Sequence, residues 1–246
     1  MDRIIKITLS LFVVILVSFV AVTAYTGYVD HAYRSSLAST YSYTFTLSTD
    51  SPLTNVTLFL PVPANPTGNS PIIERISSHE LRGIPETWRT ELYDAGKGTY
   101  VKVTVPAIIP PAGTSAKDPY TITLSADIPS KSLIDTIDPV AKSPLFRPIQ
   151  DLKPAECKDN TTTLAGGQCF TYLTSLYAKY DADPNAAVSF SSSLIGKNSW
   201  KVFEPETNEY RTSVYLLMFG EQNGWTSVAG YLEKGIGAYD APVLEK

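Results

Sequence analysis

Apolar and polar residues alternate with a period of two from Thr40 to near the end of the chain, and this restricts the fold more than any other feature. The stretch TYSYTFTL places four apolar side chains on one face of a strand: Tyr41, Tyr43, Phe45 and Leu47. Side chains of a strand point alternately to its two faces, so the pattern is typical of half-buried β-strands. The sequence therefore predicts an all-β body.

About ten segments carry this alternation, a number suited to a β-sandwich or barrel. Three pairs are predicted as hairpins: TYSYTFTL with VTLFLPV, ETWRTELYD with TYVKVTV, and EYRTSVYLLMF with WTSVAGYLEK. The proline-rich connection 129–156 is either a linker between two small β-units or a long crossover. Because neither half of the chain offers enough paired inner faces, we predict a single β-sandwich.

An uncharged run of 23 residues, Ile7 to Val29, precedes the β-region. As a helix it would be about 35 Å long, enough to cross a hydrocarbon core of about 30 Å. Arg3 and Lys6 lie before the run, and the positive-inside rule places them in the cytoplasm. The predicted organisation is a cytoplasmic N-terminus (1–6), a transmembrane anchor (7–29), a short stalk or helical extension (30–39) and an extracellular β-sandwich (40–246).

A cleavable signal peptide is the alternative interpretation of this run. Met1 to Lys6 would be its basic region, and Val22-Thr23-Ala24 would precede the cleaved bond. The apolar stretch is longer than the roughly 7 to 15 residues usual in a signal peptide, which favours a retained single-pass anchor. Cleavage after Ala24 would make the protein secreted, but both interpretations export the body.

The two cysteines of the chain, Cys157 and Cys169, enclose a polar segment with a pair of glycines that can reverse the chain. In an oxidising compartment such a pair forms a disulfide worth about 3 kcal/mol by loop entropy. Zinc needs four ligands, and the two histidines are remote in sequence. The spacing also differs from a CxxC redox motif. We therefore predict a structural disulfide and a location outside the cytoplasm.

Two N-x-T sequons mark candidate glycosylation sites, at Asn55 and Asn160. Asn65 and Asn69 are excluded because proline follows in each triplet. Asn160 lies in the polar segment between the cysteines, where we expect an exposed loop.

The segment YDADPN is a candidate calcium site, because Asp181, Asp183 and Asn185 follow the i, i+2, i+4 spacing that opens many calcium loops. The match is truncated: Ala186 stands where such a loop has glycine, and Ser192 stands where it has glutamate. A turn between two strands explains the same residues without a metal. Both interpretations stay open, and no other cofactor is predicted.

Nothing in the sequence indicates nucleic-acid binding or catalysis. The net charge is −4 and there is no basic stripe. Nucleophile elbows, zinc-protease helices and phosphate loops are missing from the sequence. Two groups of carboxylates are interpreted as solvated loop charges, namely Asp135 with Asp138, and Glu204 with Glu206 and Glu209. We expect a protein that is not an enzyme.

The many aromatic residues suggest either core packing or a sugar-binding platform. Most are spaced two apart on strands, as an inner sheet face requires, so core packing is preferred. Trp88, Trp200 and Trp225 all lie near strand ends, where the two roles look alike in sequence.

The segment NVTLFLPVP (55–63), with the preceding YSYTFTLST (41–49), resembles archaeal cell-surface proteins of unassigned function that carry an N-terminal membrane anchor. The resemblance implies an outward-facing, anchored protein. The architecture of one hydrophobic helix before a β-domain is similar to type IV pilin-like subunits and to stator-type accessory proteins of archaeal filaments. A pilin-like processing site would need a small residue just before the apolar helix and usually a glutamate five residues into it. Here Lys6-Ile7 stand at the start of the helix, and Leu11 and Phe12 occupy its early part.

Three functions are therefore compared. The first is a non-enzymatic, membrane-anchored surface protein whose β-sandwich binds a protein or glycan of the cell envelope. The second is a carbohydrate- or calcium-dependent binding module, or an accessory subunit of a surface filament. The third is an exported hydrolase assembled from distant acids. Exposed coplanar aromatics would favour a carbohydrate module, and an exposed apolar patch would favour the first function.

Overall fold

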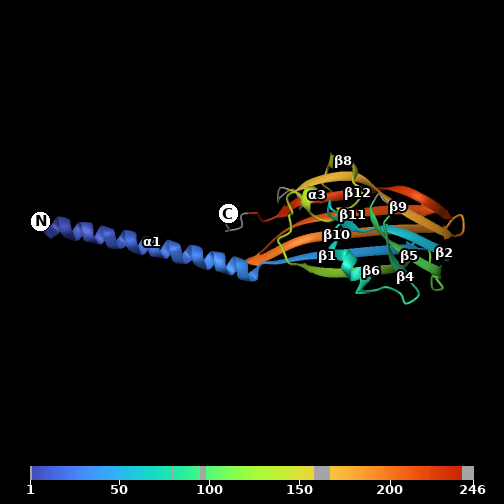
Figure 1. The fold of residues 1–246 in the computed structure, drawn as a ribbon, viewed down its shortest axis with the longest axis horizontal. Helices are drawn as coiled ribbons and strands as arrows, with labels where there is room; N and C mark the ends of the chain where they lie inside the picture. The colour runs from blue at the N-terminus through green and yellow to red at the C-terminus, as the bar shows by residue number, and fades with distance from the viewer. Residues whose placement is uncertain (1, 79, 95–97, 158–166, 240–246) are drawn as a thin grey trace.

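The computed structural model describes residues 2–78, 80–94, 98–157 and 167–239, which form one long helix and a strongly curled sheet (Figure 1). The helices are α1 (Asp2–Ser36), α2 (Pro71–Ser77) and α3 (Pro139–Lys142). The strands are β1 (Ala38–Thr49), β2 (Leu53–Pro61), β3 (Pro63–Ala64), β4 (Arg89–Asp94), β5 (Thr99–Ile108), β6 (Tyr120–Ser130), β7 (Leu145–Phe146), β8 (Gln150–Ala155), β9 (Gln168–Asp181), β10 (Ala187–Lys201), β11 (Pro205–Phe219) and β12 (Gln222–Gly237).

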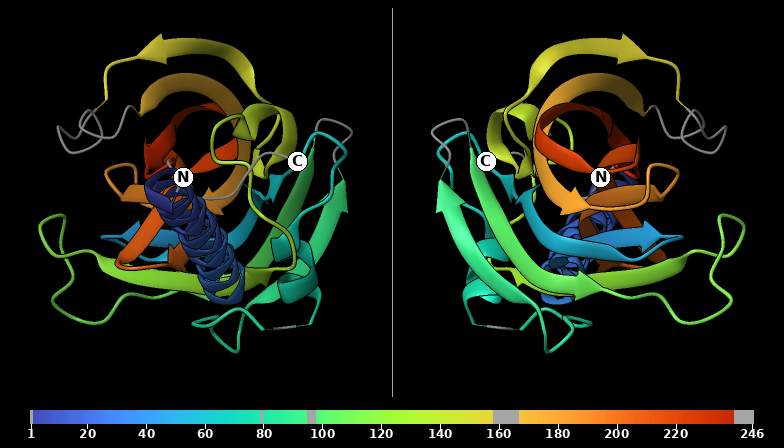
Figure 2. Two further views of the ribbon diagram at one scale, coloured as in Figure 1. Left: turned by 90° about the vertical axis from the view of Figure 1, so that its left-hand side faces the viewer. Right: turned by 90° about the vertical axis from the view of Figure 1, so that its right-hand side faces the viewer.

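Ten strands belong to one antiparallel sheet, in the order β4-β5-β2-β9-β12-β11-β10-β1-β6, with β8 also paired to β9. Viewed along α1, this sheet curls around a common interior (Figure 2). The all-β prediction is confirmed for the body. The structure shows a single curled sheet where two facing sheets were expected, because hydrogen-bonded pairing continues without a break from β4 to β6. Strand count and alternation alone do not distinguish these two arrangements.

Two of the three predicted hairpins are confirmed. β4 pairs with β5, and β11 pairs with β12, each across a short glycine-containing connection. The predicted β1–β2 hairpin is wrong: β1 pairs with β10 and β6, whereas β2 pairs with β5 and β9. The chain at Asp50 is held instead by the first residue of β10, since Asp50 N–H donates to the Ala187 carbonyl and its side chain accepts from Ala187 N–H.

The interior of the curled sheet contains the apolar side chains that the alternation predicted. Phe45 and Leu47 of β1 are fully buried, and so are residues of the same inward parity on the other strands, among them Leu58, Val103 and Leu194. Burial raises the pKa of Tyr43, also on this face, to about 12. The hydrophobic effect of this shared core is what holds the curl together.

The two ends of the sheet, β4 and β6, are bridged by α2 and the segment that follows it. Ser70 caps α2 by accepting from the Ile72 N–H, and Ile72 and Ile76 are buried against the sheet. Next, Arg82 and Ser125 of β6 exchange two backbone hydrogen bonds of 2.9 and 3.0 Å. The curled sheet is thus closed by a short segment outside the main strands.

A surface ion pair reinforces this closure, and its effect should depend on pH. The carboxylate of Asp127 accepts hydrogen bonds from Ser42 and Arg82, which lower its pKa. The lowered pKa means that Asp127 stabilises the fold at neutral pH and loses this effect as the pH falls below about 4. Because the pair is exposed, we expect Asp127→Asn to cost less than about 1 kcal/mol at pH 7.

Urea unfolding of the detergent-solubilised chain at pH 7 and pH 3 measures this difference, with Glu86→Gln as an exposed control. An equal cost of Asp127→Asn at both pH values would contradict the assignment.

The connection 129–156 is a crossover that runs from β6 to β9. It contains α3 and β7, the latter paired with β3, and it ends in β8, which pairs with the first half of β9. The crossover covers the end of the curled sheet that lies next to α1 (Figure 1).

A buried polar network fixes the crossover to this end of the sheet. Asn198 of β10 lies at its centre: its Oδ1 accepts from Ser39 Oγ at 2.7 Å and from Ile134 N–H at 3.0 Å. Its Nδ2 donates to the Ile134 carbonyl and to Asn208 Oδ1. Thr136 also donates to Asn208 at 3.1 Å. Four chain segments are therefore joined through one amide.

α1 is long and apolar enough to cross a membrane, and its apolar stretch is not buried inside the protein. The same composition would suit a signal sequence. The segment predicted as a stalk is helical as far as Ser36, and β1 begins two residues later.

The last turns of α1 pack against the end of β10. Ser36 Oγ donates to the Lys201 carbonyl at 3.0 Å and accepts from Lys201 N–H at 2.9 Å. The ring of Tyr33 lies 5.7 Å from that of Trp200, and both are buried. The helix and the curled sheet are consequently joined without a flexible linker.

Candidate interaction surface

The C-terminal part of strand β11, from Val214 to Phe219, is apolar on both faces, although only one of them lines the interior. Val214 and Met218 point inward and are buried. The alternate side chains Tyr215, Leu217 and Phe219 point outward and are 58%, 46% and 61% exposed. On the neighbouring strand β12, Trp225 also points outward and is 48% exposed. We call these four outward residues the outer apolar strip.

An aromatic cluster continues from the strip across the outer face of the sheet. The Trp225 ring packs edge-on against Tyr177 of β9 and Tyr100 of β5, with centroids 5.5 and 5.1 Å apart. Phe59 of β2 stacks on Tyr177 at 4.8 Å and on Tyr93 of β4 at 4.6 Å. Aromatic side chains from five strands therefore meet on the outside of the sheet.

The rings of the aromatic cluster pack mainly against one another. Phe59 has Tyr93 and Tyr177 stacked against it, so little of its face is left for a sugar ring. Tyr100 is fully buried, which raises its pKa. The exposed coplanar platform that would favour a carbohydrate module is therefore not formed by Phe59 and its neighbours.

A polar hollow lies beside the aromatic cluster, one residue pair further along β2 and β9. It is lined by Asn55, Thr57, Thr104, Lys179 and Asp181, among others. Asn55 sits at a β-bulge with φ of 54°, and its Nδ2 donates to Asp181 Oδ2 at 2.5 Å. Amide, ammonium and carboxylate groups thus line an open recess next to Phe59 and Tyr177.

The candidate calcium residues have other hydrogen-bond partners. Asp181 accepts from Asn55, and Asp183 Oδ1 accepts from the Asn185 N–H at 2.9 Å in the β9–β10 turn. This is the side-chain pattern of a turn, which explains the spacing without a metal. Within the described ranges, His, Cys, Asp and Glu side chains form no group of three placed to hold a metal. The calcium site stays a prediction.

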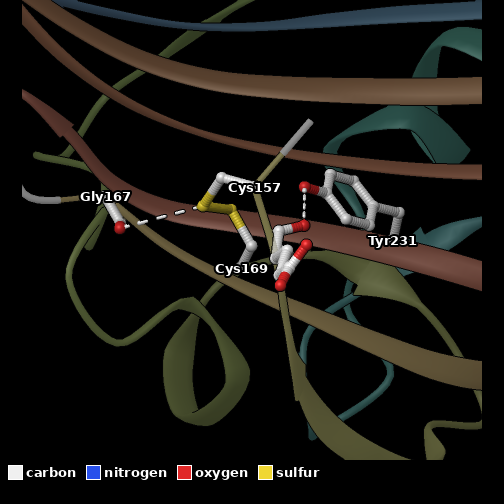
Figure 3. Close-up of a disulfide and its surroundings, with 5 residues drawn as sticks. Cys157, Gly167, Cys169 and Tyr231 are labelled. Atoms are coloured by element: carbon white, nitrogen blue, oxygen red, sulfur yellow. Dashed lines mark hydrogen bonds between the residues drawn. A yellow bond between two sulfur atoms is a disulfide. The ribbon is translucent and has the colours of Figure 1, made fainter. Parts of the chain in front are cut away.

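Cys157 and Cys169 form the predicted disulfide, with their Cα atoms 5.3 Å apart (Figure 3). It ties the end of the crossover to the start of β9, where Ala155 pairs with Cys169. Tyr231 of β12 donates to the Glu156 carbonyl at 3.3 Å beside it. The bond is therefore structural in position, joining β8 to β9.

The predicted glycosylation sites differ in what the structure describes. Asn55 is exposed on β2, at the hollow. Asn160 lies outside the described residues. Glycosylation at both positions stays a prediction.

The acidic clusters noted in the sequence have local partners. Asp135 accepts from Lys142 at 2.8 Å and from two backbone N–H groups; burial alone would raise its pKa, but these bonds outweigh it and lower the pKa. Glu206 accepts from the Trp200 indole N–H at 2.8 Å. Glu209 pairs with Arg211 at 2.5 Å. These carboxylates have structural bonds within the fold.

The outer apolar strip was not identified from the sequence. The available signal was the uninterrupted run VYLLMF (214–219), which leaves an apolar side chain on both faces of β11. Of the three tryptophans, Trp88 and Trp200 are buried as core packing predicts, whereas Trp225 is exposed.

Comparison with protein-family models, with curated proteins and with solved structures found no match to this chain.

Proposed function

We propose that this chain is a non-enzymatic, membrane-anchored protein whose β-domain lies outside the cytoplasm and binds another protein of the cell envelope through the outer apolar strip. The observation that carries the proposal is the exposure of Tyr215, Leu217 and Phe219 on a sheet whose opposite face already has a complete core. Contiguous exposed apolar surface on a folded domain marks an interaction site.

The location is supported by three features of the chain. α1 is long enough to span a bilayer, and the positive charges of Arg3 and Lys6 lie at its start. The Cys157–Cys169 disulfide is typical of an oxidising compartment. Together they support a single-pass orientation with the N-terminus in the cytoplasm.

A protein partner is preferred over a sugar because of the chemistry of the outer apolar strip. Its members combine aliphatic and aromatic side chains, as the centre of a protein interface does. Sugar rings need open aromatic faces flanked by polar groups, and the rings of Phe59 and Tyr177 are stacked on each other.

Photo-crosslinking from the strip tests this proposal in native membranes. With a photoreactive amino acid at Leu217, we expect a discrete crosslinked protein that mass spectrometry identifies, and Leu217→Ser should reduce its co-purification several-fold. Leu92 on β4 is the matched control, since it is apolar and 43% exposed but lies on the end strand of the sheet, separated from β11 by four other strands. Equal crosslinking from positions 217 and 92, or none from 217, would refute the proposed interface.

Glycan binding is a second candidate, favoured by the polar hollow. Asn55, Lys179 and Asp181 offer the donors and acceptors that recognise sugar hydroxyls, next to the edge of the aromatic cluster. Lys179→Ala should then abolish retention on envelope polysaccharide, while Lys197→Ala on the exposed face of β10 should not. Unchanged retention of both variants would eliminate this candidate.

A further inference from the structure

The tip of the β10–β11 hairpin lies beside the membrane helix. Between Lys201 and Pro205 the chain turns, and Phe203 at this turn is 63% exposed. Its ring centroid lies 6.3 Å from the rings of both Tyr25 and Tyr28 on α1. Phe203 therefore sits alongside the helix, level with the turn between these two tyrosines.

The charges on α1 determine where this turn lies relative to the bilayer. Lys6 and Asp30 bound the uncharged run, and they are about 36 Å apart along a helix with a rise of about 1.5 Å per residue. A hydrocarbon core about 30 Å thick fits between them with only about 6 Å to spare. Its outer boundary therefore falls within a few residues of Tyr28.

Phe203 shares this depth because it contacts Tyr25 and Tyr28. The interfacial layer extends roughly 5 to 8 Å beyond the hydrocarbon on each side. A helix tilt of about 20° shortens the projected span by only about 2 Å, so the conclusion does not depend on an upright helix.

We propose that the β10–β11 tip is a second membrane contact, in which Phe203 inserts into the interfacial layer of the lipid bilayer beside α1. The proposal rests on the membrane anchoring proposed above and adds a lipid-binding element to the β-domain itself. An aromatic ring at this depth is in its preferred position, because the interface favours amphipathic and aromatic side chains.

The surroundings of Phe203 agree with a lipid partner. Tyr25 and Tyr28 are themselves largely exposed in the protein, as lipid-facing residues of a single helix would be. The two hydrogen bonds between Ser36 and the backbone of Lys201 hold the β10–β11 hairpin against the helix. Leu133 is also exposed, and it belongs to the crossover that covers the end of the sheet next to α1.

Depth-dependent quenching on the full chain in lipid vesicles tests the proposal. An environment-sensitive fluorophore is attached to a single introduced cysteine, with the native cysteines kept oxidised. We expect the Phe203→Cys label to emit at shorter wavelength and to be quenched several-fold more by spin-labelled lipid than the matched Phe219→Cys label. Phe219 is equally exposed, at 61%, but lies at the opposite end of β11.

A third label, at Val14→Cys in the middle of α1, separates this inference from the anchor proposal. If the label at Val14 is quenched and the label at Phe203 behaves like that at Phe219, the second membrane contact is wrong and the anchor stands. If the label at Val14 is not quenched, the anchor fails and the inference that rests on it fails too.

Discussion

Replacing Gly196 with alanine is expected to destabilise the protein by about 4 kcal/mol, from overpacking plus the loss of a buried hydrogen bond. Gly196 of β10 pairs directly with Tyr210 of β11, and the tyrosine ring lies close against the glycine. A Cβ at Gly196 would come within 2.2 Å of this ring. The ring cannot move aside easily, because it is fully buried and its hydroxyl donates to the Pro144 carbonyl at 2.7 Å.

The control is Gly224→Ala on β12, where a Cβ would meet nothing within 4 Å. This variant should be neutral or slightly stabilising, since alanine restricts the unfolded chain. Urea unfolding of the detergent-solubilised chain, followed by near-ultraviolet circular dichroism, measures both. A free energy of unfolding that is the same for the two variants would show that the Gly196–Tyr210 pairing is not as described.

Removing the amide of Asn198 is expected to cost about 4 kcal/mol, because several buried polar groups would lose their partners at once. Asn198→Ala would leave Ser39 Oγ, the Ile134 N–H and carbonyl, and the Asn208 side chain without this amide. Asn198 is only 1% exposed, so water cannot easily replace the lost bonds.

Asn223→Ala is the matched control for this prediction. Asn223 is exposed on β12 and accepts one weak hydrogen bond, from the Tyr177 hydroxyl at 3.5 Å. Its removal should change the free energy of unfolding by less than about 0.5 kcal/mol. The network would be shown to be unimportant if both alanine variants unfolded at the same urea concentration.

Local features of the fold could be predicted from the sequence. The alternation in β1 correctly placed Phe45 and Leu47 in the core, because a period of two is a property of the strand itself. The β4–β5 and β11–β12 hairpins were also predictable, since their turns and partner strands lie close together in the chain.

Long-range features could not be predicted in this way. The turn residues between β1 and β2 predict a hairpin, yet the two strands do not pair with each other. Their actual neighbours depend on the order of the complete sheet. The buried network of Asn198 could not be predicted from the sequence of β10, because its hydrogen-bond partners Ser39 and Asn208 come from separate segments of the chain.

The candidate site was missed for a related reason. Trp200 and Trp225 both belong to strands, and alternation alone does not say which face of each strand is inside. The structure buries Trp200 against Tyr33 of α1, a contact between the long N-terminal helix and the body that strand patterns do not encode. It leaves Trp225 on the outer face beside Tyr177.

The placement of β1 also has a consequence for the order in which the chain can fold during its synthesis. β1 follows α1 directly, so it is the first strand to be synthesised, yet Ala38 pairs with Ser199 and Ser39 with Ser130. Such non-local pairing is slow and leaves strand edges open while synthesis continues. β1 therefore has no partner strand until β6 has been made, and its second edge stays open until β10 follows.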